Sequence, residues 1–235
     1  MKLLAIDSSG LVATVALLHN DILMGEYTIH NKKTHSQTLL PMIREMMDMA
    51  EVDVSELDAI AVAAGPGSFT GLRIGASTAK GLAQALSVPI VSVPTLEGLA
   101  FNLAGADAIV CPLMDARRNQ AYYGIYDVSG KRPTTIVEQD AAPLETVIEK
   151  VNQLDRAVIF LGDGVPVFAD QLKADVKVPF RFAPDSVRYQ KASSIAVLGK
   201  YYLEEKQEMT AKDFAPIYLR LSQAERERLE QGKSI

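Results

Sequence analysis

Few residues in this sequence have the types and spacing that metal binding or nucleophilic catalysis requires. The three histidines, His19, His30 and His35, include no pair four residues apart, the helical spacing that directs two imidazoles at one zinc ion. The single cysteine, Cys111, excludes an internal disulfide and a thiolate zinc cluster, and its apolar neighbours favour a buried hydrophobic role. We therefore predict no metal site and no cofactor.

Acidic, hydroxyl and basic side chains gather at three expected turns. Asp7-Ser8-Ser9-Gly10 ends the first strand, where a phosphate loop would stand, but it holds fewer glycines and hydroxyls than such a loop offers. Gly162-Asp163-Gly164 could form a second loop, although a plain turn before a helix is the commoner role. For Asp115 beside Arg117 and Arg118, an ion pair that holds the loop is favoured over a general base. A possible nucleotide cleft, with no catalytic residue assigned, is predicted from Asp7, Ser8, Ser9, Arg73, Asp115 and Arg118.

A glycine-rich segment, Gly65-Pro66-Gly67-Ser68-Phe69-Thr70-Gly71-Leu72-Arg73-Ile74-Gly75, follows a buried strand and opens a helix. Backbone N–H groups at such a place can hold an anion. However, no Gly-Lys-Ser/Thr closes the segment as in a P-loop, and the spacing from Gly67 to Gly71 is one residue too long for a dinucleotide fingerprint. A tight strand-to-helix turn is the favoured interpretation, and phosphate binding remains the alternative.

Two helices carry more apolar or small residues than one face against a sheet needs. Gly71, Gly75, Ala79 and Ala83 recur every four residues and predict a smooth stripe that another helix can approach closely. The helix from about residue 36 to 50 is apolar around most of its circumference and rich in methionine. We favour a two-helix docking surface, with burial inside the monomer as the alternative. The predicted partner interface comprises Ser36, Leu39, Leu40, Ile43, Met46, Met47, Gly71, Leu72, Gly75, Ala76, Ala79 and Ala83.

The order of the expected elements indicates the fold class. Three strands, at about residues 3–7, 11–19 and 22–30, precede alternating helices and strands, and a shorter version of this series follows Gly105. This order predicts an α/β protein with the two-lobed actin-like, sugar-kinase and Hsp70-like (ASKHA) fold. We expect an N-terminal lobe at 1–104 that carries the docking helices, a smaller lobe at 105–221 and a charged helical tail at 222–235.

Bulk composition limits the class of function. The 235 residues are 48% hydrophobic and 23% charged, as in soluble globular proteins. A formal net charge of −5 and the lack of a Lys/Arg block argue against a nucleic-acid binder that works alone. The first residues lack a long apolar region, and no stretch approaches the length of a membrane span. The sequence therefore predicts a cytoplasmic protein that contacts RNA, if at all, through a partner.

Several motifs together resemble those of the TsaB (YeaZ) family, and they are spread over nearly the whole chain. They are Ile6-Asp7-Ser8-Ser9, His35-Ser36 with Leu39-Leu40-Pro41, the Gly65–Gly75 segment, Val93-Pro94-Thr95-Leu96-Glu97, Met114-Asp115-Ala116-Arg117-Arg118 before Ala121-Tyr122, Gly162-Asp163-Gly164, and Pro216-Ile217-Tyr218-Leu219-Arg220 with Ala224-Glu225. The glycine-rich segment is the most specific of these.

The resemblance implies a shortened actin-like fold and a non-catalytic scaffold role. It implies a heterodimer with the transferase TsaD through the two helices, recruitment of the ATPase TsaE, and a homodimer when the chain is alone. The assembled complex would transfer a threonylcarbamoyl group from threonylcarbamoyl-AMP to N6 of adenosine 37, so tRNA is contacted only through the complex. A stand-alone ATP- or metal-dependent enzyme of the same fold, kinase or glycoprotease-like, is the alternative.

Overall fold

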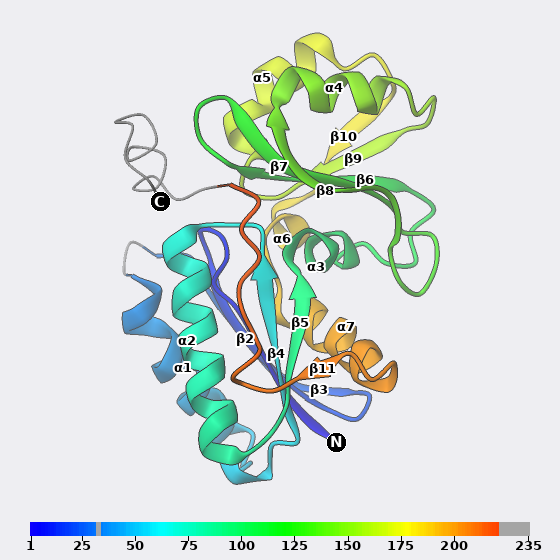
Figure 1. Ribbon diagram of the computed structural model, residues 1–235. Helices are drawn as coiled ribbons and strands as arrows, with labels where there is room; N and C mark the ends of the chain where they lie inside the picture. Colours follow the sequence, from blue (N-terminus) through cyan, green and yellow to red (C-terminus); the bar gives the residue numbers. More distant parts are fainter. Residues whose placement is uncertain (32–33, 221–235) are drawn as a thin grey trace, which may run out of the picture.

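The computed structural model describes residues 1–31 and 34–220, which form two lobes, each built on one sheet (Figure 1). The predicted tail at 222–235 lies outside the described residues. In the lower lobe of Figure 1, β1 (Lys2–Asp7), β2 (Ala13–His19) and β3 (Ile22–Ile29) form an antiparallel meander. Strands β4 (Ala59–Gly65) and β5 (Ile90–Pro94) extend it in parallel with β1, and β11 (Glu208–Met209) pairs antiparallel with β5.

Helices cover both faces of this first sheet. Helices α1 (His35–Met49) and α2 (Phe69–Leu86) lie side by side on one face, and α7 (Ala192–Glu204) covers the other (Figure 1). Every residue of β4 is buried, as its continuous apolar character predicts for a strand covered on both faces. The sheet thus gives α1 and α2 a rigid support.

The second lobe repeats the strand order of the first. Its strands are β6 (Ile109–Asp115), β7 (Gln120–Asp127), β8 (Thr134–Pro143), β9 (Val158–Leu161) and β10 (Phe180–Phe182). Their order, β10-β9-β6-β7-β8, corresponds to β5-β4-β1-β2-β3 in the first sheet. Helices α4 (Leu144–Asn152) and α5 (Val165–Asp175) cover one face, whereas α3 (Thr95–Phe101) and the short α6 (Asp185–Arg188) lie between the lobes (Figure 1). The repeated order confirms the two-lobed actin-like fold with a shortened second lobe.

The path of the C-terminal part of the chain corrects the expected boundary between the lobes. Residues 105–221 were predicted to form the second lobe, but α7 and β11 belong to the first. Ile195 and Leu198 of α7 pack against the first sheet beside Leu3 and Val91. A sheet with parallel central strands is stable when both faces are covered, and α1 and α2 cover only one. Within the described residues, the chain therefore crosses to the second lobe after α3 and returns to the first around α6, and its C-terminal segment meets the second lobe again at Ala116 through Arg220.

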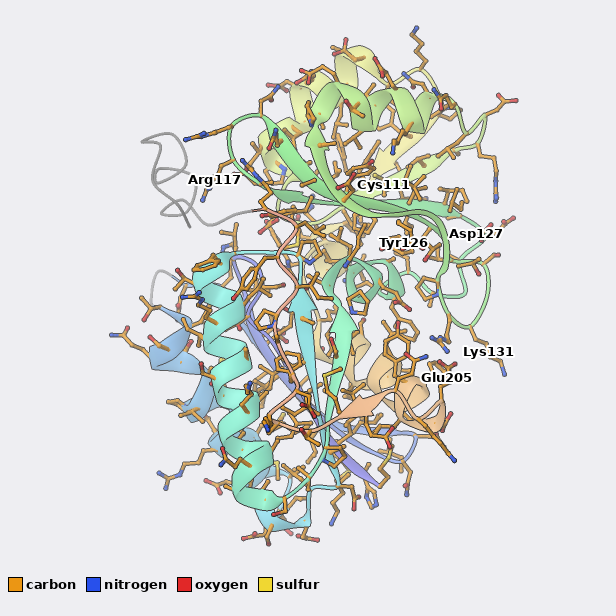
Figure 2. All side chains as sticks on the ribbon, viewed as in Figure 1. Cys111, Arg117, Tyr126, Asp127, Lys131 and Glu205 are labelled. Carbon is orange, nitrogen blue, oxygen red and sulfur yellow. The ribbon has the colours of Figure 1, made fainter. Side chains whose placement is uncertain are left out.

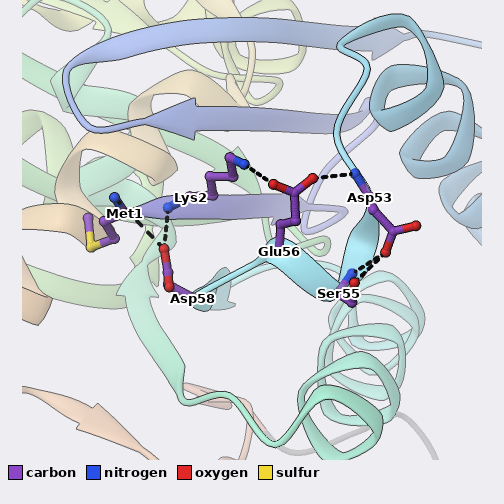
Figure 3. Close-up of polar contacts among 6 residues, drawn as sticks. All are labelled: Met1, Lys2, Asp53, Ser55, Glu56 and Asp58. Atoms are coloured by element: carbon purple, nitrogen blue, oxygen red, sulfur yellow. Dashed lines mark hydrogen bonds and ion pairs between the residues drawn. The ribbon is translucent and has the colours of Figure 1, made fainter.

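The N-terminus is held to the segment that enters β4 by a small polar network (Figure 3). Asp53 caps the 3₁₀ helix η1 (Val54–Glu56) by accepting a hydrogen bond from the Ser55 backbone N–H at 2.8 Å. The Lys2 side chain pairs with Glu56, and the Lys2 backbone N–H donates to Asp58 Oδ2 at 2.6 Å. These contacts align the start of β1 with the start of β4.

Candidate functional site: a helix face and an interlobe cleft

The small-residue stripe of α2 faces inward, which contradicts its predicted place on a docking surface. A Cβ atom at Gly71 would collide with the backbone oxygen of Ser8, and one at Gly75 would lie 2.6 Å from Ser8 Oγ. Ala76, Ala79 and Ala83 are buried in the core of the first lobe. The stripe lets α2 lie close to β1 and β4, so its small residues serve packing within the chain.

The apolar face predicted for α1 is also internal. Leu39, Ile43, Met46 and Met47 are buried in the same core, and Leu72 of α2 is buried as well. Only two of the predicted interface residues, Ser36 and Leu40, are exposed. The sequence pattern shows that α1 is apolar around most of its circumference. It could not show that the sheet and α2 together bury most of that apolar surface.

A different set of residues forms the outer face of the two helices. On α2 the exposed residues include Ser77, Gly81 and Ala85, which again recur every four positions, and a Cβ atom at Gly81 would meet nothing within 4 Å. On α1, Leu40 is 54% exposed and Met49 is 74% exposed. Leu40 and Ser77 line one groove between the two helices, whereas Met49, nine positions after Leu40, projects from the opposite side of α1. We call Ser77, Gly81, Ala85 and Leu40 the outer helix face. It combines a flat surface on α2 with one exposed apolar side chain on α1.

A groove of about 400 Å³ separates the N-terminal halves of α1 and α2. Its wall includes Leu40, Ile74 and Arg73. The Arg73 guanidinium lies 4.0 Å from the centroid of the Phe69 ring, and its Nε donates to Tyr218 Oη at 3.4 Å. Arg73 therefore belongs to the helix groove and not to the cleft in which it was predicted.

A second cavity, of about 570 Å³, lies between the lobes. Its walls come from loops at the ends of strands and helices in both lobes. The first lobe supplies Ser9, Gly10, Leu11, Gly67, Ser68, Phe69 and Thr70, and the second supplies Met114, Asp115, Ala116, Arg117, Tyr122, Asp163 and Val167, with Tyr218 and Arg220 of the C-terminal segment. This arrangement is the expected one, because both β1 and β6 end at the interlobe junction.

The residues predicted for a nucleotide cleft are only partly brought together there. Ser9 and Asp115 line the cavity, whereas Asp7 and Ser8 are buried behind the loop. Asp7 Oδ1 accepts hydrogen bonds from Ser9 N at 2.8 Å and Ser9 Oγ at 2.6 Å, and burial raises the pKa of Asp7 to about 6. Ser8 Oγ donates to the Gly71 backbone oxygen at 2.9 Å. Arg118 lies at a neighbouring surface depression with Asn119 and Gln171.

Asp115 is held by its own loop, as predicted. Its carboxylate accepts hydrogen bonds from the Arg117 backbone N–H at 2.7 Å and from Arg117 Nη1 at 2.9 Å. The Arg220 guanidinium donates to the backbone oxygen of Ala116 from the C-terminal segment. Arg220 and Tyr218 were not among the predicted cleft residues, because no local pattern indicates that the C-terminal segment returns to this turn.

Asp163 is a further cleft residue, which the sequence placed in a possible second loop but not in the predicted cleft set. Its side chain is nine-tenths buried, and burial raises its pKa to about 6 although backbone N–H groups of Asp115 and Leu11 oppose that shift. Its Oδ1 atom has no hydrogen-bond partner among the described residues. The Gly162-Asp163-Gly164 motif was the available signal, but a turn of this composition is common.

Residues 1–31 and 34–220 also bear on metal binding and on membrane insertion. These residues contain no group of three or more His, Cys, Asp or Glu side chains placed to hold a metal ion. Within the same residues, no helix is long and apolar enough to cross a membrane.

Comparisons with known proteins match a TsaD family model and relatives named TsaB or YeaZ. Residues 23–228 match the family model described as TsaD, tRNA N6-adenosine threonylcarbamoyltransferase. The chain is 35% identical over 234 residues to the tRNA threonylcarbamoyladenosine biosynthesis protein TsaB of Bacillus subtilis, covering 99% of this chain and 100% of that protein. It is 30% identical over 175 residues to the TsaB protein of Escherichia coli, covering 72% and 74% of the two chains. The solved structure of YeaZ from Pseudomonas aeruginosa superimposes with a TM-score of 0.77 at 28% identity, covering 93% of this chain and 99% of that chain.

Proposed function

Since this chain belongs to the TsaB (YeaZ) family, we propose that it is a non-catalytic scaffold subunit of the machinery that makes threonylcarbamoyladenosine in tRNA. In this proposal it binds a TsaD-type transferase and enables recruitment of a TsaE-type ATPase in the cytoplasm. It contacts tRNA through that complex, and it pairs with a second copy of itself when the transferase is absent.

The outer helix face is the observation that carries the proposal. Ser77, Gly81 and Ala85 let a partner helix approach the backbone of α2, and Leu40 adds an exposed apolar side chain in the groove that Ser77 also lines. An exposed apolar side chain beside a flat helix surface on a rigid support is typical of docking surfaces. The match to the TsaD family model supports a partner of related fold, because two related chains can meet through equivalent helices.

The interlobe cleft supports the absence of catalysis in this subunit. Asp7 is buried behind Ser9, and the Asp115 carboxylate is occupied by Arg117. A general base must reach the proton that it removes, and neither carboxylate is presented in that way. Asp163 is a third carboxyl group in the cleft, and its Oδ1 atom has no hydrogen-bond partner among the described residues. We therefore assign the reacting groups to the partner from the family resemblance together with the occupied Asp7 and Asp115 carboxylates.

The docking surface is tested with substitutions that change exposed atoms only. Leu40→Asp and Ser77→Arg should each weaken binding to a TsaD-type subunit about tenfold or more, because they place charge or bulk at a closely packed contact. Light scattering on a sizing column measures the complex, and titration calorimetry measures the affinity. The matched control is Ile136→Asp, which adds charge on β8 of the second lobe at a position that is 45% exposed.

Circular dichroism confirms that each variant remains folded before binding is compared. Normal affinity in both Leu40→Asp and Ser77→Arg would move the interface away from the outer helix face. Failure of the unsubstituted chain to bind any TsaD-type subunit would contradict the scaffold role and favour the stand-alone enzyme.

A further inference from the structure

The lobes touch on the side of the molecule away from the interlobe cleft. Figure 2 shows Arg117, a cleft residue, on one side of the molecule and Lys131 and Glu205 on the other. Lys131 lies in the turn between β7 and β8 of the second lobe, and Glu205 follows α7 of the first lobe.

The crossing after α3 lies beside the β7–β8 turn, where the Gly105 backbone N–H donates to the backbone oxygens of Val128 at 2.7 Å and Gly130 at 3.1 Å. The crossing around α6 lies between the two sides (Figure 1). The contact at the β7–β8 turn is therefore on the opposite side of this crossing from the cleft.

Arg132 makes this contact with three side chains of the first lobe. Its guanidinium donates to the Glu205 carboxylate, and the two side chains are 31% and 45% exposed. The same guanidinium lies 5.3 Å from the ring centroid of Tyr201 and 5.1 Å from that of Tyr202. An ion pair that also stacks on two aromatic rings holds its geometry better than an isolated surface pair.

The contact continues into the helix that joins the lobes. Tyr202 Oη donates to the carboxylate of Glu97, which lies on α3 and is mostly buried. Arg132 is thereby connected, through Tyr202, to the first crossing of the chain. Three segments meet at one cluster: the β7–β8 turn, the end of α7, and α3.

We propose that the β7–β8 turn is a latch that sets the angle between the lobes, with Arg132 as the residue that closes it on Glu205, Tyr201 and Tyr202. Because the latch and the cleft lie on opposite sides of the crossing around α6, holding one side fixes the width of the other. The distance from Ser9 in the first lobe to Asp115 and Asp163 in the second then depends on Arg132. This inference concerns the free chain and does not depend on the docking role.

Distance measurement between the lobes by pulsed electron paramagnetic resonance tests the latch. Nitroxide labels are placed through Ile22→Cys on β3 and Val167→Cys on α5, positions that are 64% and 59% exposed. Cys111 is fully buried and stays unlabelled. An excess of unlabelled protein removes distances between copies. We expect one narrow distance distribution, and we expect Arg132→Ala and Glu205→Ala each to broaden it and shift its mean.

Lys131→Ala is the matched control, because it removes a neighbouring charge from the same turn and should leave the distribution unchanged. If Arg132→Ala does not fold, Glu205→Gln removes the charge of the ion pair with almost no change in shape and should still broaden the distribution. Distributions that match the labelled parent protein in folded Arg132 and Glu205 variants would overturn the latch and leave the lobe angle to the two crossings alone.

Discussion

Asp7 places a carboxyl group at the end of β1 with only 1% of the residue exposed. The hydrogen bonds from Ser9 favour the charged form, but burial outweighs them and raises the pKa from 3.8 to about 6. Its role in this structure is to fold the β1–β2 turn so that the loop lies under α2. A group of this kind couples the stability of the first lobe to pH.

The pH dependence of folding should therefore change in Asp7→Asn. Between pH 4 and 6 the native state holds a proton that the unfolded chain has lost, so the free energy of unfolding falls as pH rises. We expect the variant to lack the part of this fall that Asp7 causes, about 2 kcal/mol between pH 4 and pH 7, whereas the part caused by Asp163 remains. Urea unfolding at several pH values measures it.

Asp170→Asn is the control for the change in net charge, because Asp170 is exposed on α5. Equal slopes of stability against pH in the parent protein and Asp7→Asn would contradict the assignment of this dependence to Asp7.

At the scale of elements, α2 uses one spacing of small residues for two purposes. The inner stripe, with Gly75, approaches β1, where Ser8 Oγ bonds to the Gly71 backbone oxygen. The outer stripe, with Gly81, faces solvent. The two stripes differ only in what surrounds them, so the same substitution should have opposite effects on the two sides of the helix.

Gly75→Ala should destabilise the protein by about 1–2 kcal/mol, because the new Cβ atom would lie 2.6 Å from Ser8 Oγ and overpack the site. Gly81→Ala should stabilise it by about 0.5–1 kcal/mol, since alanine favours the helix and nothing obstructs its Cβ atom. Thermal and urea unfolding measure the change in the free energy of unfolding for each variant. Changes of the same sign in both variants would contradict the orientation of α2.

For the whole molecule, the first lobe is completed by a segment from the far end of the chain. Helix α7 packs on Leu3, Ala5 and Ala61, and the Ser193 backbone N–H donates to Glu26 Oε1 at 2.8 Å. The C-terminal segment returns further, where the Ile217 backbone N–H donates to the Ala64 oxygen at 2.7 Å. The first lobe therefore needs the C-terminal part of the chain to complete its core, although the second lobe separates the two parts in sequence.

Residues 1–104 alone should accordingly fail to fold, because one face of their sheet would be exposed to water. A chain that joins 1–104 to 189–220 by a short glycine–serine linker should fold, since Asn102 Nδ2 already lies 2.8 Å from the Tyr189 backbone oxygen. Circular dichroism and cooperative urea unfolding distinguish the two. A cooperative transition in 1–104 by itself would show that α7 is dispensable.

The sequence alone determined the elements with strong periodicity or clear ends, and through their order it determined the fold class. The meander at the start, α1 and α2 all lie close to their predicted positions. Strands β8 and β10 were not predicted, because Glu138, Asp140 and Pro143 in β8 are atypical of strands and β10 has only three residues. The family resemblance followed from motifs, which the comparisons confirmed.

Only the tertiary structure decided which side of each helix is covered and which lobe completes which core. Periodicity identifies an apolar or small face, but that face can meet the chain's own sheet or a partner equally well. Gly75 and Ala79 are buried and Ser77 and Gly81 are exposed because β1 lies beneath one side of α2 and nothing described lies above the other. Likewise, the interlobe cleft and the Arg132 cluster join residues distant in sequence, and no local pattern records such contacts.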